Sequence, residues 1–189
     1  MLKGIPEILS PELLKVLCEM GHSDRLVIAD GNFPVESMGK NAITIRCDGH
    51  GVPEILEAIL KVFPLDTYVE HPVNLMEVMK GDNVETPIWD TYKEIIRKYD
   101  DRGDAVVGNI ERFKFYDEAK TAYCIISTSE KALYANVMLQ KGVVINDCSV
   151  SVIFRPSFKF YKLYHIFSPG SLVFRGILLW KGEVFAGNE

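Results

Sequence analysis

The sequence lacks several features that would each define a class of protein. No apolar run reaches the ~18–20 residues of a membrane-spanning helix, so no membrane span is expected. The first twelve residues contain an early proline and two glutamates, which does not fit a secretory signal peptide. The four cysteines lie far apart and form no CxxC pair. These absences favour reduced thiols and a cytoplasmic location.

Familiar catalytic and metal-binding motifs are also missing. There is no P-loop, no GxSxG and no HExxH, and the glycines of the segment DGHG at 48–51 do not make a dinucleotide fingerprint. The four histidines are scattered, so a metal site is not expected. The composition is that of a globular protein, with 48% hydrophobic and 25% charged residues.

Charge and aromatic residues divide the chain into two parts. Residues 1–143 carry 16 Lys/Arg and 23 Asp/Glu, whereas residues 144–189 carry 5 and 3 and hold 9 aromatic residues. An acidic body argues against nucleic acid, whose backbone attracts clustered cations. We therefore predict a domain over 1–143 and an atypical aromatic-rich extension over 144–189. The extension is interpreted as a variant C-terminus, with a membrane-surface or partner-binding tail as the alternative.

Apolar periodicity predicts helices that alternate with strands. Ser10 is a good N-cap and Gly21 a good terminator for the first helix, and RLVIAD at 25–30 is typical of a strand buried on both faces. The predicted helices are 11–20, 53–63, 87–99 and 116–122, and the predicted strands are 25–30, 42–47, 74–79, 105–110, 123–128 and 134–140. This order predicts an α/β layered sheet, closed at its end by an antiparallel pair of the last two strands.

Polar side chains gather just beyond the predicted elements, where α/β folds place ligand sites. The candidates are His22, Asp30, Asp66, Arg112, Tyr116, Tyr134 and Asn136. Tyr134 and Asn136 would share one face of a strand. Each position also has a structural reading, such as a helix cap, a loop cap, a half-buried core residue or a sheet edge. The residues alone predict a small polar ligand and no particular reaction.

Read as whole segments, the chain resembles a known family, the L-fucose mutarotases, which are relatives of the D-ribose pyranases. The segments that carry the resemblance are LSPELLKVLCEMGHSDRLVIADGNFP, IRCDGHGVPEILEAILKVFPLDTYVE and IERFKFYDEAKTAYCIIST, followed by ALYANVMLQKGV, and it runs from about 2 to 143. The resemblance implies a three-layer α/β/α sandwich with a central mixed sheet of about six strands. It also implies cofactor-independent exchange of sugar anomers in a homo-oligomer, typically a decameric ring with sites near subunit contacts.

The resemblance assigns roles to the candidate residues. His22 falls on the proton-donor histidine of the family, and Tyr116 falls on the tyrosine of the segment that contains Arg112. From its chemistry, we expect Tyr116 to be the partner of His22 in proton transfer. The residues implied to bind sugar hydroxyls are Asp30, Asp66, Arg112, Tyr134 and Asn136. The methyl group of L-fucose would need an apolar wall from Phe33, Met38 or Val69.

Two alternatives stay open beside L-fucose exchange. Ala135 stands where fucose members usually have glycine and ribose members often have alanine, but Arg112 stands where ribose members tend to have histidine. A D-ribose-type pyranase is therefore the first alternative. A sugar-binding module without catalysis, which would not need His22 to exchange protons, is the second.

Overall fold

A mixed sheet forms the centre of the molecule. The computed structural model describes residues 2–144, and the six strands found there are ordered β2-β5-β1-β6-β3-β4. The strands are β1 (Arg25–Ala29), β2 (Ile43–Cys47), β3 (Val73–Met76), β4 (Val107–Ile110), β5 (Cys124–Thr128) and β6 (Val137–Gln140). The helices are α1 (Pro11–Glu19), α2 (Val35–Met38), α3 (Val52–Leu60), α4 (Ile88–Ile96), the 3-10 helix η1 (Gly103–Val106) and α5 (Arg112–Ala119).

Strand β6 is the one antiparallel strand within the described sheet. It lies between β1 and β3, with Ile28 opposite Val137 and Leu75 opposite Val137, whereas β2, β5 and β1 run parallel to one another. The prediction that the last two strands pair with each other is wrong. Strand β1 is apolar and buried along nearly its whole length, as is typical of a central strand. It pairs with β5 on one side and with β6 on the other, so residues 129–136, which connect β5 to β6, cross over β1.

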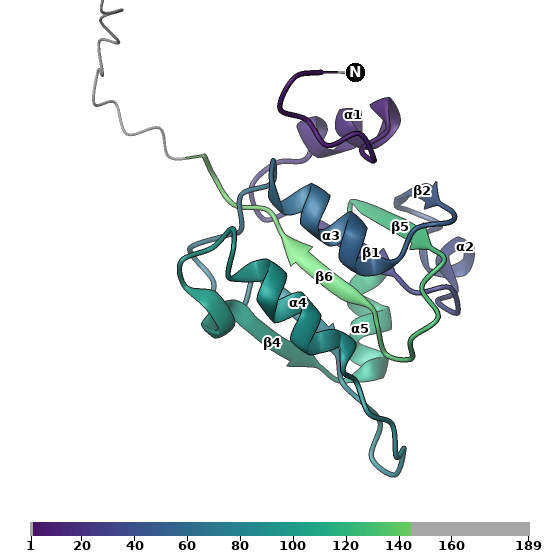
Figure 1. The fold of residues 1–189 in the computed structure, drawn as a ribbon. Helices are drawn as coiled ribbons and strands as arrows, with labels where there is room; N and C mark the ends of the chain where they lie inside the picture. Colours follow the sequence, from purple (N-terminus) through teal and green to yellow (C-terminus); the bar gives the residue numbers. More distant parts are fainter. Residues whose placement is uncertain (1, 145–189) are drawn as a thin grey trace, which may run out of the picture. The chain divides into compact units, whose positions relative to one another are not determined.

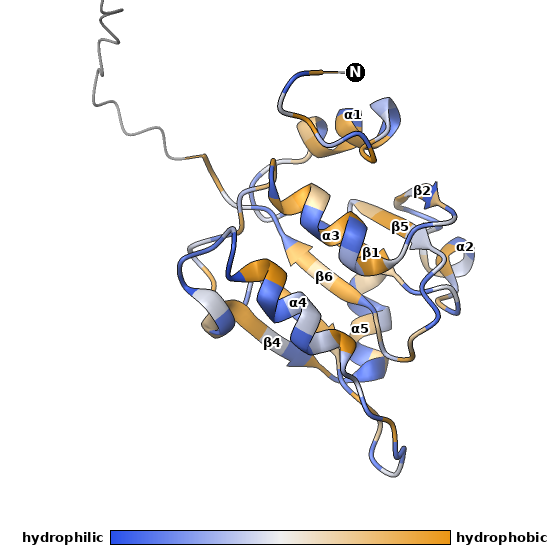
Figure 2. Cartoon of the chain, in the orientation of Figure 1, coloured by the Kyte–Doolittle hydropathy of each residue, from blue (hydrophilic) through white to orange (hydrophobic). Residues whose placement is uncertain are grey.

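Helices cover both faces of the sheet, which confirms the three-layer α/β/α prediction. Side chains alternate along β1, so Leu26 and Ile28 join the core under α1, α3 and α4, whereas Val27 and Ala29 join the core under α2 and α5. Figure 1 shows α3 and α4 on one face and α5 on the other. In Figure 2 the strands β1, β5 and β6 are apolar along most of their length, while the helices alternate between apolar and polar positions.

Three local predictions differ from the structure. The short helix α2 occupies part of the predicted loop 31–40. Helix α5 begins at Arg112 rather than Tyr116, because the Glu111 carboxylate accepts hydrogen bonds from the first free N–H groups. Strand β6 begins only at Val137, so Tyr134 and Asn136 do not share a strand face.

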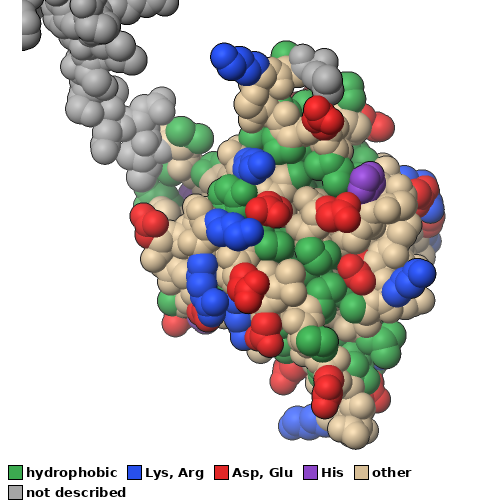
Figure 3. All heavy atoms as spheres, viewed as in Figure 1, with side chains coloured by type: hydrophobic (Ala, Val, Ile, Leu, Met, Phe, Trp, Pro, Cys, Tyr) green, Lys and Arg blue, Asp and Glu red, His purple; other side chains and the backbone are tan. Residues whose placement is uncertain are grey.

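The surface of the described domain is mixed in charge. Figure 3 shows acidic and basic side chains interspersed over α3 and α4, and one such pair joins Lys98 Nζ to Glu57 Oε1 at 3.1 Å. None of the helices within residues 2–144 has the length and apolar character needed to cross a membrane. The predicted extension, apart from its first residue, lies outside the described residues.

Candidate active site

Five of the seven predicted site residues line one cleft of about 390 Å³. The cleft lies where β1, β3 and β4 end and β6 begins, so it is built from loops, the last residue of β3 and the N-terminal part of α5. The predicted residues in its wall are Asp30, Arg112, Tyr116, Tyr134 and Asn136. A second cleft of about 590 Å³ shares Phe33 with the first and is lined by none of the seven predicted site residues.

Asp30 and Asn136 form the buried floor of this cleft. Asn136 Nδ2 donates to Asp30 Oδ2 at 2.7 Å, and Asp30 N donates to Asn136 Oδ1 at 2.9 Å. The second carboxylate oxygen, Oδ1, accepts from Asn32 N at 2.9 Å. Burial raises the pKa of the Asp30 carboxyl, and these hydrogen bonds offset part of that rise. The floor therefore presents fixed polar atoms that can bind hydroxyl groups.

Helix α5 brings Arg112 and Tyr116 together because they are one turn apart. Arg112 Nε donates to the Tyr116 hydroxyl oxygen at 3.4 Å, and the guanidinium carbon lies 5.7 Å from the centre of the tyrosine ring. The Phe33 ring lies 5.5 Å from that of Tyr116 and supplies an apolar part of the wall. Met38 and Val69, the other predicted candidates for an apolar wall, are not among the lining residues.

A left-handed turn places Tyr134 in the cleft. Its φ is 54°, and the carbonyl groups of Tyr134 and Ala135 are held by α4, through Trp89 Nε1 at 2.9 Å and the Tyr92 hydroxyl at 2.8 Å. The Tyr134 hydroxyl donates to Asp82, and this hydrogen bond raises the pKa of the phenol. The loop residue Asp82 thereby connects the rim of the cleft to Tyr134.

His22 and Asp66 form a second polar group. His22 Nε2 lies 3.1 Å from Asp66 Oδ2, and the same oxygen accepts from Gln140 Nε2 at 3.0 Å. Asp66 Oδ1 accepts from Tyr68 N at 2.9 Å, so the carboxylate, whose side chain is 1% exposed, has three partners. Burial alone would raise the pKa of Asp66, but the hydrogen bonds from Tyr68, Gln140 and His22 outweigh it and hold that pKa below its usual value.

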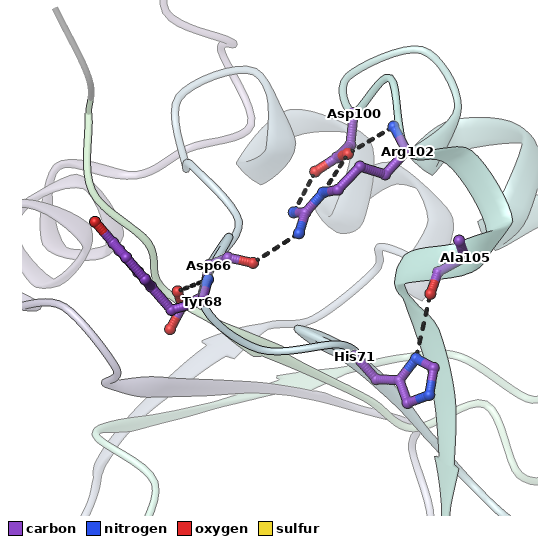
Figure 4. Close-up of polar contacts among 6 residues, drawn as sticks. All are labelled: Asp66, Tyr68, His71, Asp100, Arg102 and Ala105. Atoms are coloured by element: carbon purple, nitrogen blue, oxygen red, sulfur yellow. Dashed lines mark hydrogen bonds and ion pairs between the residues drawn. The ribbon is translucent and has the colours of Figure 1, made fainter.

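Arg102 also holds the backbone of Asp66 in place. Figure 4 shows Arg102 between Asp100 and the Asp66 carbonyl, which accepts from Arg102 Nη1 at 3.0 Å. Asp100 binds the other side of that guanidinium through two hydrogen bonds of 2.9 and 2.8 Å. The loop that carries Asp66 and Tyr68 is thus anchored at its backbone as well as at its carboxylate.

The two polar groups lie at opposite ends of β1. His22 precedes this strand and Asp30 follows it. Five residues of extended strand separate them by roughly 16 Å, at about 3.3 Å per residue. One copy of the chain therefore does not bring His22 and Asp66 into the cleft.

The comparisons with known proteins agree with this architecture. Residues 3–144 match the family described as the RbsD / FucU transport protein family. The chain belongs to this family. A relative from Homo sapiens, named fucose mutarotase, is 48% identical over 149 residues, which cover 76% of this chain and 94% of the relative. The resemblance seen in the sequence is thereby confirmed.

Two solved structures share the fold. FucU from Bifidobacterium longum is 65% identical with a TM-score of 0.75, and the match covers 76% of this chain and all of that chain (100%). The fucose mutarotase of Streptococcus pneumoniae, solved in complex with L-fucose, is 44% identical with a TM-score of 0.71 and the same coverage, 76% and 100%.

Several residues that line the cleft of this RbsD / FucU chain were not predicted. They are Asn32, Met76, Asp82, Val84 and Leu133. Met76 reads in the sequence as an ordinary strand residue, and Asp82 and Val84 lie in a polar loop without a motif. Asn32 could have been predicted from the sequence, because it is a polar residue two positions after Asp30, the last residue of the predicted strand.

Proposed function

We propose that this protein interconverts the α and β anomers of L-fucose without a cofactor. The observation that carries the proposal is the cleft in which Asp30, Arg112, Tyr116, Tyr134 and Asn136 meet, in a chain 44% identical to a mutarotase solved with L-fucose. Carboxylate, amide, phenol and guanidinium groups around a partly apolar wall are the groups that bind a small polyhydroxylated molecule.

The reaction requires two proton transfers at one end of the sugar. A base removes the proton of the C1 hydroxyl while an acid protonates the ring oxygen, so the bond between C1 and the ring oxygen breaks and an aldehyde forms. After rotation about the C1–C2 bond, the ring closes on the other face of C1 and the two protons return. General acid–base catalysis of this kind contributes about 10²–10⁴-fold.

In this proposal His22 takes the proton of the C1 hydroxyl group as the ring opens, and it is the proton donor when the ring closes. Asp66 is ionised at neutral pH and acts only as an acceptor, so the His22 nitrogen that faces it, Nε2, carries the hydrogen. The other ring nitrogen, Nδ1, is then the atom that exchanges a proton with the sugar. Asp66 thereby fixes the tautomer and orientation of the imidazole.

Tyr116 is the proposed partner in the cleft. Arg112 donates to the oxygen of its hydroxyl group, which leaves the hydroxyl proton free to pass to the ring oxygen as the ring opens and to return as it closes. Asp30, Asn136 and Tyr134 would grip the hydroxyl groups remote from C1, so that C1 itself can turn. Phe33 would contact the methyl group of fucose.

A complete site therefore needs two copies of the chain. The cleft of one copy would receive His22 and Asp66 of another, and we call this arrangement the composite site. It supports a homo-oligomer, with a closed ring as the simplest form in which every copy both gives and receives the same surface. Tyr68, which is 73% exposed and packs edge-on against His22 at 5.4 Å, would be covered in such a contact.

The described thiols fit a reducing compartment. Cys18, Cys47 and Cys124 are free, and Cys124 is fully buried within β5. We accordingly propose a cytoplasmic location.

Exchange NMR on the purified full-length chain tests the proposed function. Magnetisation transfer between the α and β signals of L-fucose should accelerate, and added EDTA should have no effect. D-ribose should be exchanged more slowly. Faster exchange of D-ribose than of L-fucose would favour the pyranase alternative, and binding without exchange would favour the sugar-binding module.

The extension leads to a second expectation. The family match ends at residue 144, while residues 144–189 hold 9 aromatic residues and only 3 acidic ones. A chain that ends at Val144 should be more soluble than the full chain and exchange L-fucose at least as fast, because the family domain is intact and an apolar segment is removed. Light scattering and exchange NMR measure the two effects. Loss of folding or of exchange in the shorter chain would show that the extension belongs to the domain.

A further inference from the structure

The end of β6 contacts both loops that carry the second polar group. Gln140 is the last residue of β6 and Lys141 follows it, and neither is among the predicted site residues. Gln140 contacts the loop of Asp66, and Lys141 contacts the loop of His22. Two adjacent residues thus connect segments that are 44 positions apart in the chain.

Gln140 holds Asp66 at two points. Its side-chain Nε2 donates to Asp66 Oδ2 at 3.0 Å, and its backbone carbonyl accepts from Asp66 N at 3.1 Å. Oδ2 is also the oxygen that faces His22 Nε2. Because Gln140 itself is fixed in the ladder opposite Arg25, it sets the rotation of the carboxylate that orients the imidazole.

Lys141 holds the turn on the other side of His22. Its Nζ donates to the carbonyl groups of Leu17 and Met20 at 2.6 Å each, which are free acceptors at the C-terminal end of α1. Its backbone carbonyl accepts from Ser23 N at 2.8 Å. Met20 and Ser23 flank the short turn that contains His22, so both ends of this turn are attached to Lys141.

We propose that Gln140 and Lys141, here called the β6 clamp, are positioning residues for the His22–Asp66 pair. Neither residue exchanges a proton with the sugar. Gln140 keeps the Asp66 carboxylate aligned with His22 Nε2. Lys141 holds the turn that contains His22 so that the imidazole stays within hydrogen-bond distance of that carboxylate. The inference rests on the proposed function, since it concerns how His22 is held for proton transfer.

Gln140→Met tests the first half of the clamp. Methionine has nearly the length and volume of glutamine but no N–H donor, so packing is preserved while Asp66 loses one partner. We expect kcat for L-fucose to fall about tenfold with KM within about twofold, because a misplacement of about 1 Å costs even more than that in rate. Nitrogen-15 spectra should show His22, assigned by its absence in His22→Gln, as a mixture of tautomers in place of the single Nε2–H form.

Lys141→Met and Lys141→Arg test the second half. The methionine variant should lower kcat about tenfold, again with little change in KM, whereas arginine, which restores N–H donors to the α1 carbonyl groups, should keep more than half of the activity. Lys15→Met is the matched control, because it removes an exposed lysine from α1 itself and should leave kcat unchanged.

The outcomes separate the inference from the proposed function. Wild-type protein that does not accelerate L-fucose exchange contradicts the proposed function. An active wild type in which Gln140→Met keeps its kcat and a single His22 tautomer overturns the clamp, as does a loss confined to KM. If Lys141→Met fails to fold, Lys141→Arg decides that half, since a variant that folds but has lost its activity would contradict the proposed role.

Discussion

Replacing His22 with alanine should lower the rate of L-fucose exchange by about 10²–10⁴-fold, the full contribution of general acid–base catalysis. The sugar-binding groups of the cleft should stay in place, because the hydrogen bond and the ring contact of His22 are made with Asp66 and Tyr68, which do not line the cleft. Binding of L-fucose should therefore persist within a fewfold. Exchange NMR gives the rate, and titration of the sugar signals gives the affinity.

A second histidine gives a matched control for this result. The side chain of His50 is 45% exposed against 42% for His22, and it contacts the Glu54 carboxylate at 2.9 Å as His22 contacts Asp66. His50→Ala should keep full activity. Full activity in His22→Ala would remove the histidine from the mechanism.

Local patterns predicted most of the elements and the floor of the cleft. The apolar run before Asp30 identified a buried central strand, and an aspartate at the end of such a strand belongs where α/β folds bind ligands. The start of α5 was misplaced because glutamate is an unusual N-cap, so Glu111 gave no signal. Tyr134 was placed on a strand because nothing in its neighbourhood marks a left-handed residue, and the Trp89 and Tyr92 side chains that hold this turn are more than 40 positions away.

The second polar group illustrates what sequence patterns cannot supply. His22 and Asp66 were both identified as candidates, but only the structure shows that the Asp66 carboxylate is buried and shared by Tyr68, Gln140 and His22. Its contacts come from segments up to 74 positions away, which no local spacing encodes. The separation of the two groups follows from the direction of β1, and the proposal of a composite site rests on this separation.

Two inactive variants should restore activity to each other when they are co-expressed. His22→Ala retains an intact cleft, and Asp30→Asn retains an intact His22–Asp66 pair. In a composite site built from two copies, a cleft of the first variant meets a histidine of the second at about one quarter of the contacts in an equal, random mixture, so about a quarter of wild-type exchange should return. Tagging the two variants differently and purifying on both tags isolates the mixed oligomer for exchange NMR.

The control combines two variants that both alter the floor of the cleft. Co-expression of Asp30→Asn with Asn136→Ala leaves every cleft defective, because these residues bind each other in the floor of the same copy. No activity should return in that mixture, however well the copies assemble. If His22→Ala and Asp30→Asn also fail to restore activity in a verified mixed oligomer, both groups must act within one copy. The roughly 16 Å between the two ends of β1 would then have to be closed by a rearrangement within a single copy, in which β1 could not remain extended.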